Sequence, residues 1–453
     1  MPSNIQDTVT DKETIANLKR QLEEKNEQLK KLQEQLDGNW VLLNSRRYRT
    51  ANAVSDTLHT VLQVRRVKSL VRKSGLEERI RDIRDYVDKV SLVKKAKTHK
   101  GIIALTGIPW DYIMRQRPHH IAPRLAAAGY LFIYIDPDAE PGMRRWINDD
   151  LLVVGGYDAI EKLSGFKNKL PMYYISIAGF PISFDELKDI KDYGFEIIYE
   201  YIDELDESIN GSLKKQVEVL KRLEELEPAL VISSARKLYD EMAKRFPEEV
   251  LLLSQNAVEI EKFQSKKRSK NSAPADLKGI IDQGKPIIGY YGAIASWLDY
   301  DLIHKVAAAR PDYNFVFIGR DYDNGLQNLN ISENIYYLGP KDYEELASYS
   351  YWFDAATIPF QNGEIAKSTS PLKLFEYMAM GVPTICTRDL RECDGYDGVM
   401  LSKDVEHFIT NTDKAIKMKQ SKAAREKLMS YAKQNTWDAR AKDMIDALNR
   451  LEA

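Results

Sequence analysis

Hydrophobic and polar positions follow one repeated pattern after about residue 100. Short apolar runs, which are typical of buried strands, alternate with amphipathic stretches long enough for helices. In the first part of this region we expect a helix at 119–128 and strands at 101–105, 131–135, 172–177, 196–201, 230–233 and 250–254. Strands separated by helices predict βαβ units and therefore a parallel sheet.

A polar segment, residues 265–285, interrupts the pattern, which then starts again. The segment is rich in Lys, Ser, Asn and Gly, as linkers are. Beyond it we expect a helix at 300–309 and strands at 286–292, 315–319, 335–338, 355–358 and 382–386. The pattern predicts an α/β protein with lobes at 99–264 and 286–435, followed by a C-terminal helix at 436–453.

Apolar residues recur on steps of three and four in the N-terminal segment, residues 1–37. The positions are Ile15, Leu18, Leu22, Leu29, Leu32 and Leu36. This spacing predicts a short coiled coil. A single solvated helix is the alternative, but it would leave the leucine stripe in water. We therefore expect a homo-oligomer.

Residues 38–98 are expected to form a helical, basic region, because 40–97 contain no proline and only one glycine. Within it, the stretch 61–73 places Val64, Val67 and Val71 on one helical face, with Arg and Lys around them. A basic amphipathic helix can lie on an anionic membrane surface. The alternative is a helix packed on the main body with its basic face in solvent.

Charge and composition narrow the class of protein. Lys plus Arg total 66 and Asp plus Glu total 68, whereas a dedicated nucleic-acid binder is usually more basic, so no nucleic-acid partner is expected. Two cysteines, Cys386 and Cys393, are too few for a disulfide framework. No apolar segment approaches the roughly 20 residues that span a bilayer, and the N-terminus has no apolar signal core. We expect a cytoplasmic protein, or one held peripherally on the inner membrane face.

Common nucleotide-binding fingerprints are missing. No GxGxxG follows an expected strand, which counts against a dinucleotide-dependent dehydrogenase, and no GxxxxGK[ST] is present, which counts against P-loop chemistry. No cluster of metal ligands is visible, so neither a cofactor nor a catalytic metal is expected. Ligand binding is expected at the carboxyl ends of the strands, in a cleft between the lobes.

The first lobe offers one candidate site, residues 115–120. Arg115, Arg117, His119 and His120 lie at the start of the first expected helix, where backbone amides and arginines attract anions. The histidines can hydrogen-bond sugar hydroxyls or a diphosphate; helix capping with solvation is the alternative. Adjacent side chains point apart, so we expect His120 alone to face the cleft. The Gly107 turn, after the first strand, is a second candidate position.

The second lobe offers a more specific segment, residues 368–383. Ser370 or a neighbour can cap a helix, and Pro371 suits its first turn. Lys373 can then add positive charge for a diphosphate, and Glu376, one turn later, can accept the two hydroxyl hydrogens of a ribose. The alternative is a surface ion pair of Lys373 and Glu376.

Four segments resemble the retaining GT-B glycosyltransferases of the family four group. Residues 371–383 resemble that group's nucleotide-sugar motif, and 116–122 are similar to a motif of members that build bacterial surface polysaccharides. Residues 290–294 and 255–258 match two further family elements. The resemblance covers about residues 100–450 and is greatest to transferases of the teichuronic-acid type. It implies the GT-B fold, with two Rossmann-like lobes, parallel sheets and an interlobe cleft.

The resemblance also implies an activity and roles for particular residues. The activity is transfer of a sugar from a nucleoside-diphosphate sugar to a hydroxyl of a glycan or lipid-linked acceptor, with retained anomeric configuration and no catalytic metal. Lys373 and His120 would be catalytic. Gly292, Arg320, Ser370, Pro371, Leu372, Lys373 and Glu376 would bind the donor, and Gly107, Arg115, Arg117, His119 and His120 would contact the sugar or acceptor.

Two positions depart from the family's pattern. The family has two glutamates eight residues apart, and here Ser368 occupies the earlier place. The basic residues that usually follow the first glycine of the second lobe are absent from 294–299. Lys373, or Arg115 and Arg117, can supply that missing positive charge.

Two other functions stay open from the sequence. Another GT-B activity, such as a nucleotide-sugar epimerase, should show acidic and histidine groups around the sugar, and no full set is evident. A coiled-coil scaffold with a degenerate transferase body is favoured by the missing glutamate but opposed by Lys373 and Glu376.

Overall fold

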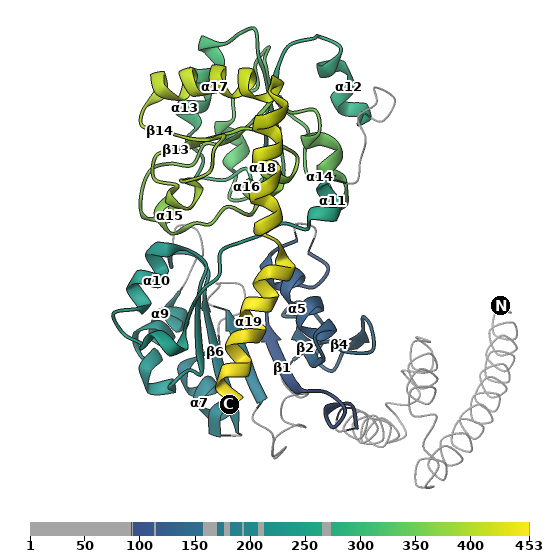
Figure 1. The fold of residues 1–453 in the computed structure, drawn as a ribbon, viewed down its shortest axis with the longest axis vertical. Coiled ribbons are helices and arrows are strands. Elements are labelled where there is room, and N and C mark those ends of the chain that lie inside the picture. Colours follow the sequence, from purple (N-terminus) through teal and green to yellow (C-terminus); the bar gives the residue numbers. More distant parts are fainter. Residues whose placement is uncertain are drawn as a thin grey trace, which may run out of the picture. The chain divides into compact units, whose positions relative to one another are not determined.

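The computed structural model describes residues 92, 94–112, 115–156, 170–175, 182–192, 194–206, 213–264 and 273–452. The predicted coiled coil at 1–37 and the basic helix at 61–73 lie outside the described residues. One compact unit spans His99–Ala453 and contains two β-sheets, one in each of the two predicted lobes (Figure 1).

The N-terminal lobe is built on an eight-stranded sheet with the order β3-β4-β2-β1-β5-β6-β7-β8. Neighbouring strands are parallel except β3, which runs antiparallel to β4. The strands are β1 (Gly101–Thr106), β2 (Tyr130–Ile135), β3 (Arg144–Trp146), β4 (Leu151–Val154), β5 (Leu170–Ile175), β6 (Phe195–Tyr201), β7 (Leu230–Ser233) and β8 (Leu251–Leu253). The sequence pattern predicted six of them, and it missed the short strands β3 and β4.

Helices cover this sheet and connect its strands. They are α5 (Arg117–Ala127), α7 (Phe184–Asp192), α9 (Lys214–Lys221) and α10 (Arg236–Met242). The next helix, α11 (Ile260–Gln264), instead buries Phe263 in the hydrophobic core of the C-terminal lobe (Figure 1). Pro118 lies in the first turn of α5, where its missing amide hydrogen costs no intrahelical bond. The apolar face of α5 buries Ile121 and Leu125 against the sheet.

The C-terminal lobe has a six-stranded, all-parallel sheet with the order β11-β10-β9-β12-β13-β14. The strands are β9 (Ile287–Tyr291), β10 (Asn314–Ile318), β11 (Ile335–Tyr337), β12 (Ala355–Ile358), β13 (Thr384–Thr387) and β14 (Val399–Ser402). The chain order reverses between β9 and β12, and in the other lobe between β1 and β5. Such reversals leave a crevice at the carboxyl ends of the strands.

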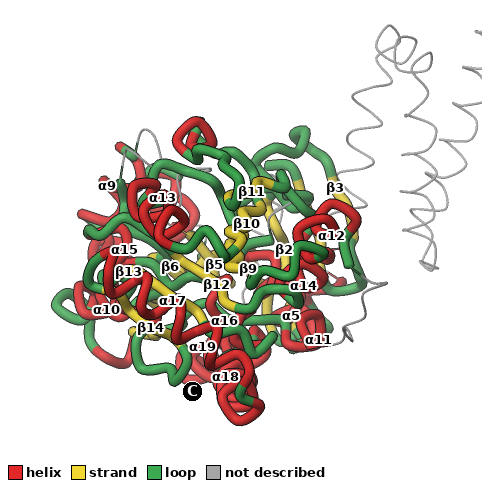
Figure 2. Tube along the Cα trace, turned by 90° about the horizontal axis from the view of Figure 1, so that it is seen from above, coloured by secondary structure: helices red, strands yellow, loops and turns green. Residues whose placement is uncertain are grey.

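The helices of the C-terminal lobe are α12 (Ala275–Ile281), α13 (Tyr300–Ala309), α14 (Tyr343–Ser350), α15 (Glu364–Ser368), α16 (Leu372–Ala379), α17 (Val405–Gln420) and α18 (Lys422–Gln434). Figure 2 shows the strands in the interior with helices toward the outside. Helix α12 falls inside the predicted linker, 265–285. It belongs to the lobe, because it buries Leu277 and Ile280 in the hydrophobic core there.

The last helix, α19 (Trp437–Glu452), returns to the N-terminal lobe and lies beside α5 (Figure 1). Trp437, Met444 and Leu448 join the core that also contains Ile103 and Leu125 of the first lobe. The sequence predicted this helix as a separate C-terminal element. Its apolar stripe instead completes the N-terminal lobe, so the chain crosses between the lobes twice.

Candidate active site

A cavity of about 280 Å³ lies between the two lobes, within the described part of the chain. Strand ends contribute to it, as Asp203 and Glu204 follow β6 and Gly292 follows β9. The N-terminal lobe also contributes Arg115 and Asn256, and the start of α16 forms much of the opposite wall. This is the crevice that two doubly wound sheets are expected to leave.

Lys373, in the first turn of α16, provides a partly desolvated positive charge to this cavity. Its ammonium nitrogen lies 5.3 Å from the ring centre of Tyr290 and 5.1 Å from that of Phe360. Burial lowers the pKa of Lys373 to about 8, although Glu376 and other groups counteract that fall. Helix-start amides have no intrahelical acceptor. The amides and the ammonium group therefore favour an anionic ligand at this wall.

Gly292 leaves the space that Lys373 occupies. Its φ is +142°, and a Cβ there would come within 2.7 Å of Cε of Lys373. The amide of Gly292 donates to the carbonyl of Ile318 at 2.9 Å, so that amide is already used. The resemblance implied that Gly292 lets amides approach a diphosphate; its structural contribution is the absence of a side chain beside the lysine.

Glu376 is almost fully buried, with 1% of its surface exposed, yet it lines the cavity. Its Oε1 has no hydrogen-bond partner among the described residues, and the hydroxyls of Tyr291 and Tyr343 also lack one there. Burial raises the pKa of Glu376 to about 7, and those two hydroxyls and Lys373 counteract the rise. Because Glu376 lines the cavity beside the Tyr291 and Tyr343 hydroxyls, a hydroxyl-bearing ligand there would complete the pairing of its carboxylate.

The start of α16 differs from the prediction in one detail. Pro371 is the N-cap residue, and no side chain caps the helix. The Ser370 hydroxyl accepts a hydrogen bond from the Asn256 amide at 3.1 Å, and the Ser370 carbonyl accepts one from Nδ2 of Asn256 at 2.6 Å. The prediction that Ser370 caps the helix is wrong; Ser370 connects the lobes. Leu372 lines the cavity together with Ser370 and Pro371.

The two arginines of the segment 115–120 have different positions. Arg115 lines the cavity and donates to the carbonyl of Trp110 at 2.9 Å. Arg117 is not part of the cavity lining: it is 2% exposed and forms an ion pair with the fully buried Glu200 at 2.5 Å. Arg117 also donates to Oγ of Ser254 at 2.8 Å. Of the two, only Arg115 is placed to replace the missing basic residues.

Neither histidine of this segment lines the cavity. Nδ1 of His119 lies 3.0 Å from the Gln116 amide, which donates to it. His120 stacks on Trp437 with ring centres 4.8 Å apart and meets the edge of Tyr343 at 5.4 Å. Burial lowers the pKa of both imidazoles. The prediction that His120 faces the cleft is therefore wrong, because its ring packs where α19 joins the N-terminal lobe.

Two further predicted positions lie outside the cavity lining. Gly107 packs against Tyr134, whose hydroxyl would be 2.4 Å from a Cβ at that position. Arg320 is exposed, although the preceding Gly319 does line the cavity. Lys341, which the sequence analysis did not name, does line the cavity and pairs with Asp276 at 2.8 Å.

Sequence reasoning missed Asp203, Glu204, Asn256 and Lys341 as cavity residues. The acidic pair was open to detection, because it follows a predicted strand of a parallel sheet, where ligands bind. Lys341 carries no such signal, since it lies in a loop beyond the short strand β11. Within the described chain, no group of three or more His, Cys, Asp or Glu residues is placed to hold a metal ion, and no helix is both long and apolar enough to cross a bilayer.

Comparisons with known proteins agree with this geometry. Residues 285–417 match the family Glycosyl transferases group 1. A 138-residue stretch is 31% identical to TuaH of Bacillus subtilis, which is named as a teichuronic acid biosynthesis glycosyltransferase; the match covers 29% of this chain and 33% of that protein. The match thus spans about a third of the relative's length.

Solved structures share the fold at low sequence identity. Sucrose-phosphate synthase of Thermosynechococcus elongatus has a TM-score of 0.59 and 13% identity over 78% of this chain and 99% of its own. HepE of Anabaena, in complex with UDP and glucose, has a TM-score of 0.58 and 11% identity. The match covers 77% of this chain and 100% of the HepE chain. The described chain therefore has the GT-B fold, and residues 285–417 of its C-terminal lobe are similar to the family Glycosyl transferases group 1.

Proposed function

We propose that this protein transfers a sugar from a nucleoside-diphosphate sugar to an acceptor hydroxyl, with retained anomeric configuration, in the synthesis of a bacterial cell-surface polysaccharide. One observation carries the proposal: Lys373 and Glu376 lie one helical turn apart on the wall of the interlobe cavity, with the carboxylate buried and incompletely paired. This arrangement suits the diphosphate and the ribose of one donor molecule.

In the proposed reaction, the bond between the anomeric carbon and the diphosphate oxygen breaks while the acceptor oxygen bonds to that carbon. Negative charge develops on the leaving diphosphate. Lys373 and the first amides of α16 stabilise this charge, and the low polarity around Lys373 strengthens the effect. The acceptor's proton passes to the leaving phosphate, so the reaction needs no basic side chain. Closure of the lobes would exclude water and limit donor hydrolysis.

A donor screen followed by a turnover assay tests the proposal. Thermal shift with a panel of nucleotide sugars, UDP-glucose among them, should identify a donor that stabilises the protein. Release of nucleoside diphosphate in the presence of polysaccharide or lipid-linked acceptors should then be measured, and NMR of the product should show the retained configuration. Tight donor binding without turnover on any acceptor would favour the scaffold function, and an inverted product would disprove retention.

We also propose that the segment 1–37 assembles the chain into a homo-oligomer. The support is the three-four spacing of Leu22 and Leu29 with their neighbours. Replacing both leucines by Asp should reduce the mass of the full-length protein in solution to that of the monomer, measured by light scattering. An unchanged mass would show that assembly, if any, does not use this stripe.

A further inference from the structure

Two carboxylates of the N-terminal lobe line the cavity immediately after strand β6. They are Asp203 and Glu204, which have no role in the mechanism above. Asp203 is exposed to the cavity and makes no ion pair or hydrogen bond within the described residues. Enclosure by protein raises its pKa to about 6, while nearby Lys373 lowers it. Asp203 is therefore close to the proposed diphosphate position.

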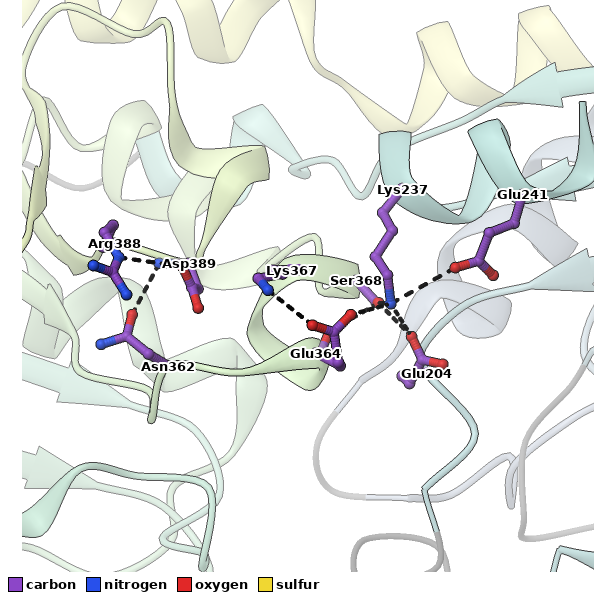
Figure 3. Close-up of polar contacts among 9 residues, drawn as sticks. All are labelled: Glu204, Lys237, Glu241, Asn362, Glu364, Lys367, Ser368, Arg388 and Asp389. Atoms are coloured by element: carbon purple, nitrogen blue, oxygen red, sulfur yellow. Dashed lines mark hydrogen bonds and ion pairs between the residues drawn. The ribbon is translucent and has the colours of Figure 1, made fainter.

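Glu204 is held from both lobes (Figure 3). Its Oε2 accepts a hydrogen bond from Oγ of Ser368 at 2.7 Å and another from Nζ of Lys237 at 2.5 Å. Ser368 ends helix α15 of the C-terminal lobe, whereas Lys237 lies on α10 of the N-terminal lobe. Lys237 also donates to the Ser368 hydroxyl at 3.1 Å, which closes a triangle of hydrogen bonds across the lobes.

This triangle fixes one oxygen of Glu204 and leaves the other available. No hydrogen bond to Oε1 is present within the described residues, and about a quarter of the side chain, 24%, is exposed. Burial lowers the pKa of Lys237, but its bonds to Glu204 and Glu364 more than offset this, so its pKa is raised. Lys237 therefore keeps its charge, and Oε1 of Glu204 remains as an acceptor for hydroxyl groups.

The unpaired Oε1 of Glu376, which is nine-tenths buried or more, independently indicates that a ligand completes this cavity. Lys373 and Glu376 account for a diphosphate and a ribose at α16. The part of the cavity lined by Asp203 and Glu204 is then left for the sugar attached to the diphosphate. Ionised carboxylates accept hydrogen bonds and repel anions, so they suit an uncharged, hydroxyl-rich sugar and oppose a uronate.

We propose that Asp203 and Glu204 bind the hydroxyl groups of the transferred sugar. Ser368 and Lys237 are positioning residues that hold Glu204 from opposite lobes. The serine that stands at the family's glutamate position thus recruits a carboxylate from the other lobe. This inference rests on the proposed function, because it assumes that the cavity holds a nucleotide sugar.

Paired affinity measurements test the inference. The affinities of UDP and UDP-glucose are measured by calorimetry for the full chain and for its Glu204→Gln, Asp203→Asn and Ser368→Ala variants; if another base is selected in the donor screen, the corresponding pair is used. Loss of a charged acceptor should lower the affinity for UDP-glucose about tenfold relative to the affinity for UDP. Ser368→Ala should give a smaller loss of the same kind, because it only releases Glu204.

Glu241→Gln is the matched control. Glu241 also contacts Lys237, at 3.7 Å, but does not line the cavity, so its variant should bind both ligands normally. Asp203→Asn breaks no ion pair among the described residues, so this variant should fold normally. A change in its affinity for UDP-glucose then reports on sugar binding and not on folding. If the variants lost affinity for UDP and for UDP-glucose equally, or lost affinity for neither, the inference would be overturned. Failure of the unaltered protein to bind any nucleotide or nucleotide sugar would instead overturn the proposed function.

Discussion

Two polar segments, 115–120 and 368–376, both flank the start of a helix, and both looked like anion sites in the sequence. In the first, Arg117 is paired with Glu200 at 2.5 Å and His119 is bonded to the Gln116 amide. In the second, the Lys373 ammonium group lies beside the ring of Tyr290 and is influenced by the carboxylates of Glu376 and Asp203, and Oε1 of Glu376 has no partner among the described residues.

The difference teaches that burial alone does not distinguish a binding residue from a structural one. Both segments are substantially buried and each holds an unpaired polar atom, Nε2 of His120 in the first and Oε1 of Glu376 in the second. They differ in that Arg117 is paired with Glu200 away from the cavity, whereas Lys373 and Glu376 line it. A satisfied buried charge supports the fold, because removing one partner leaves the other uncompensated. An unsatisfied one indicates that a ligand provides the missing partner.

Arg117→Ala should produce the largest effect, and it should be on stability. The substitution leaves the carboxylate of Glu200, which is 0% exposed, without its counter-ion. We expect the free energy of unfolding to fall by about 3–5 kcal/mol. Urea denaturation followed by circular dichroism measures the change.

Arg115→Ala is the matched control for this prediction. Arg115 lies two residues away but lines the cavity, so its loss should change the free energy of unfolding by only about 0.5 kcal/mol. If Arg117→Ala kept normal stability but lost UDP binding, the roles assigned to the two arginines would be reversed.

Lys373→Ala should have the opposite signature, a loss of activity with the fold intact. The lysine stabilises charge that develops on the leaving diphosphate, so turnover should fall about 100- to 1,000-fold. Initial rates of nucleoside diphosphate release measure it. Lys367→Ala, on the preceding helix α15, removes an exposed lysine that pairs with Glu364 and should leave the rate unchanged. Normal turnover in Lys373→Ala would remove the catalytic role.

The sequence predicted the second segment better than the first for a physical reason. Pro371, Lys373 and Glu376 lie within two helical turns, so local spacing alone brings them to one wall. The partner of Arg117 is 83 positions away, and the ring that covers His120 belongs to Trp437, near the C-terminus. Those contacts depend on how α19 and β6 pack, which a local pattern does not contain.

The same limit applies to the fold: local patterns predict elements that depend on local sequence, and they do not contain long-range packing. Strands with several consecutive apolar residues, such as β7 and β12, were predicted at the correct residues because burial on both faces demands such runs. The sheet-edge strands β3 and β14, whose residues are partly exposed, were missed. Strand β4 was missed as well, although its four apolar residues are fully buried. Asp203 and Glu204 were missed as site residues because their significance comes from the opposite lobe.

Glu376→Gln should give an intermediate effect, on nucleotide affinity. Above its pKa of about 7, the Glu376 carboxylate accepts hydrogens from both ribose hydroxyls, whereas the amide presents one oxygen and a donor. We expect about tenfold weaker UDP binding. The unaltered protein should also prefer UDP to 2′-deoxy-UDP, and the variant should lose that preference. A variant that discriminates as well as the original would place the ribose elsewhere.

The smallest effect is a pH dependence that separates the two segments again. Because the pKa of Lys373 is about 8, its protonated fraction and hence UDP affinity should fall about threefold between pH 7.5 and 8.5. In the unfolded chain this lysine keeps its proton up to its ordinary pKa of 10.5, so the unfolded state binds more protons between pH 8 and 10.5. The contribution of Lys373 to stability therefore rises with pH over that window, while UDP affinity falls.

The buried His119 and His120, whose pKa values are lowered, should add no transition in affinity near pH 6.5. Calorimetric titration across this range measures the affinity, and Lys373→Arg should abolish the alkaline decline because arginine stays protonated. A decline centred near pH 6.5 would instead return the anion site to the histidines of the first segment.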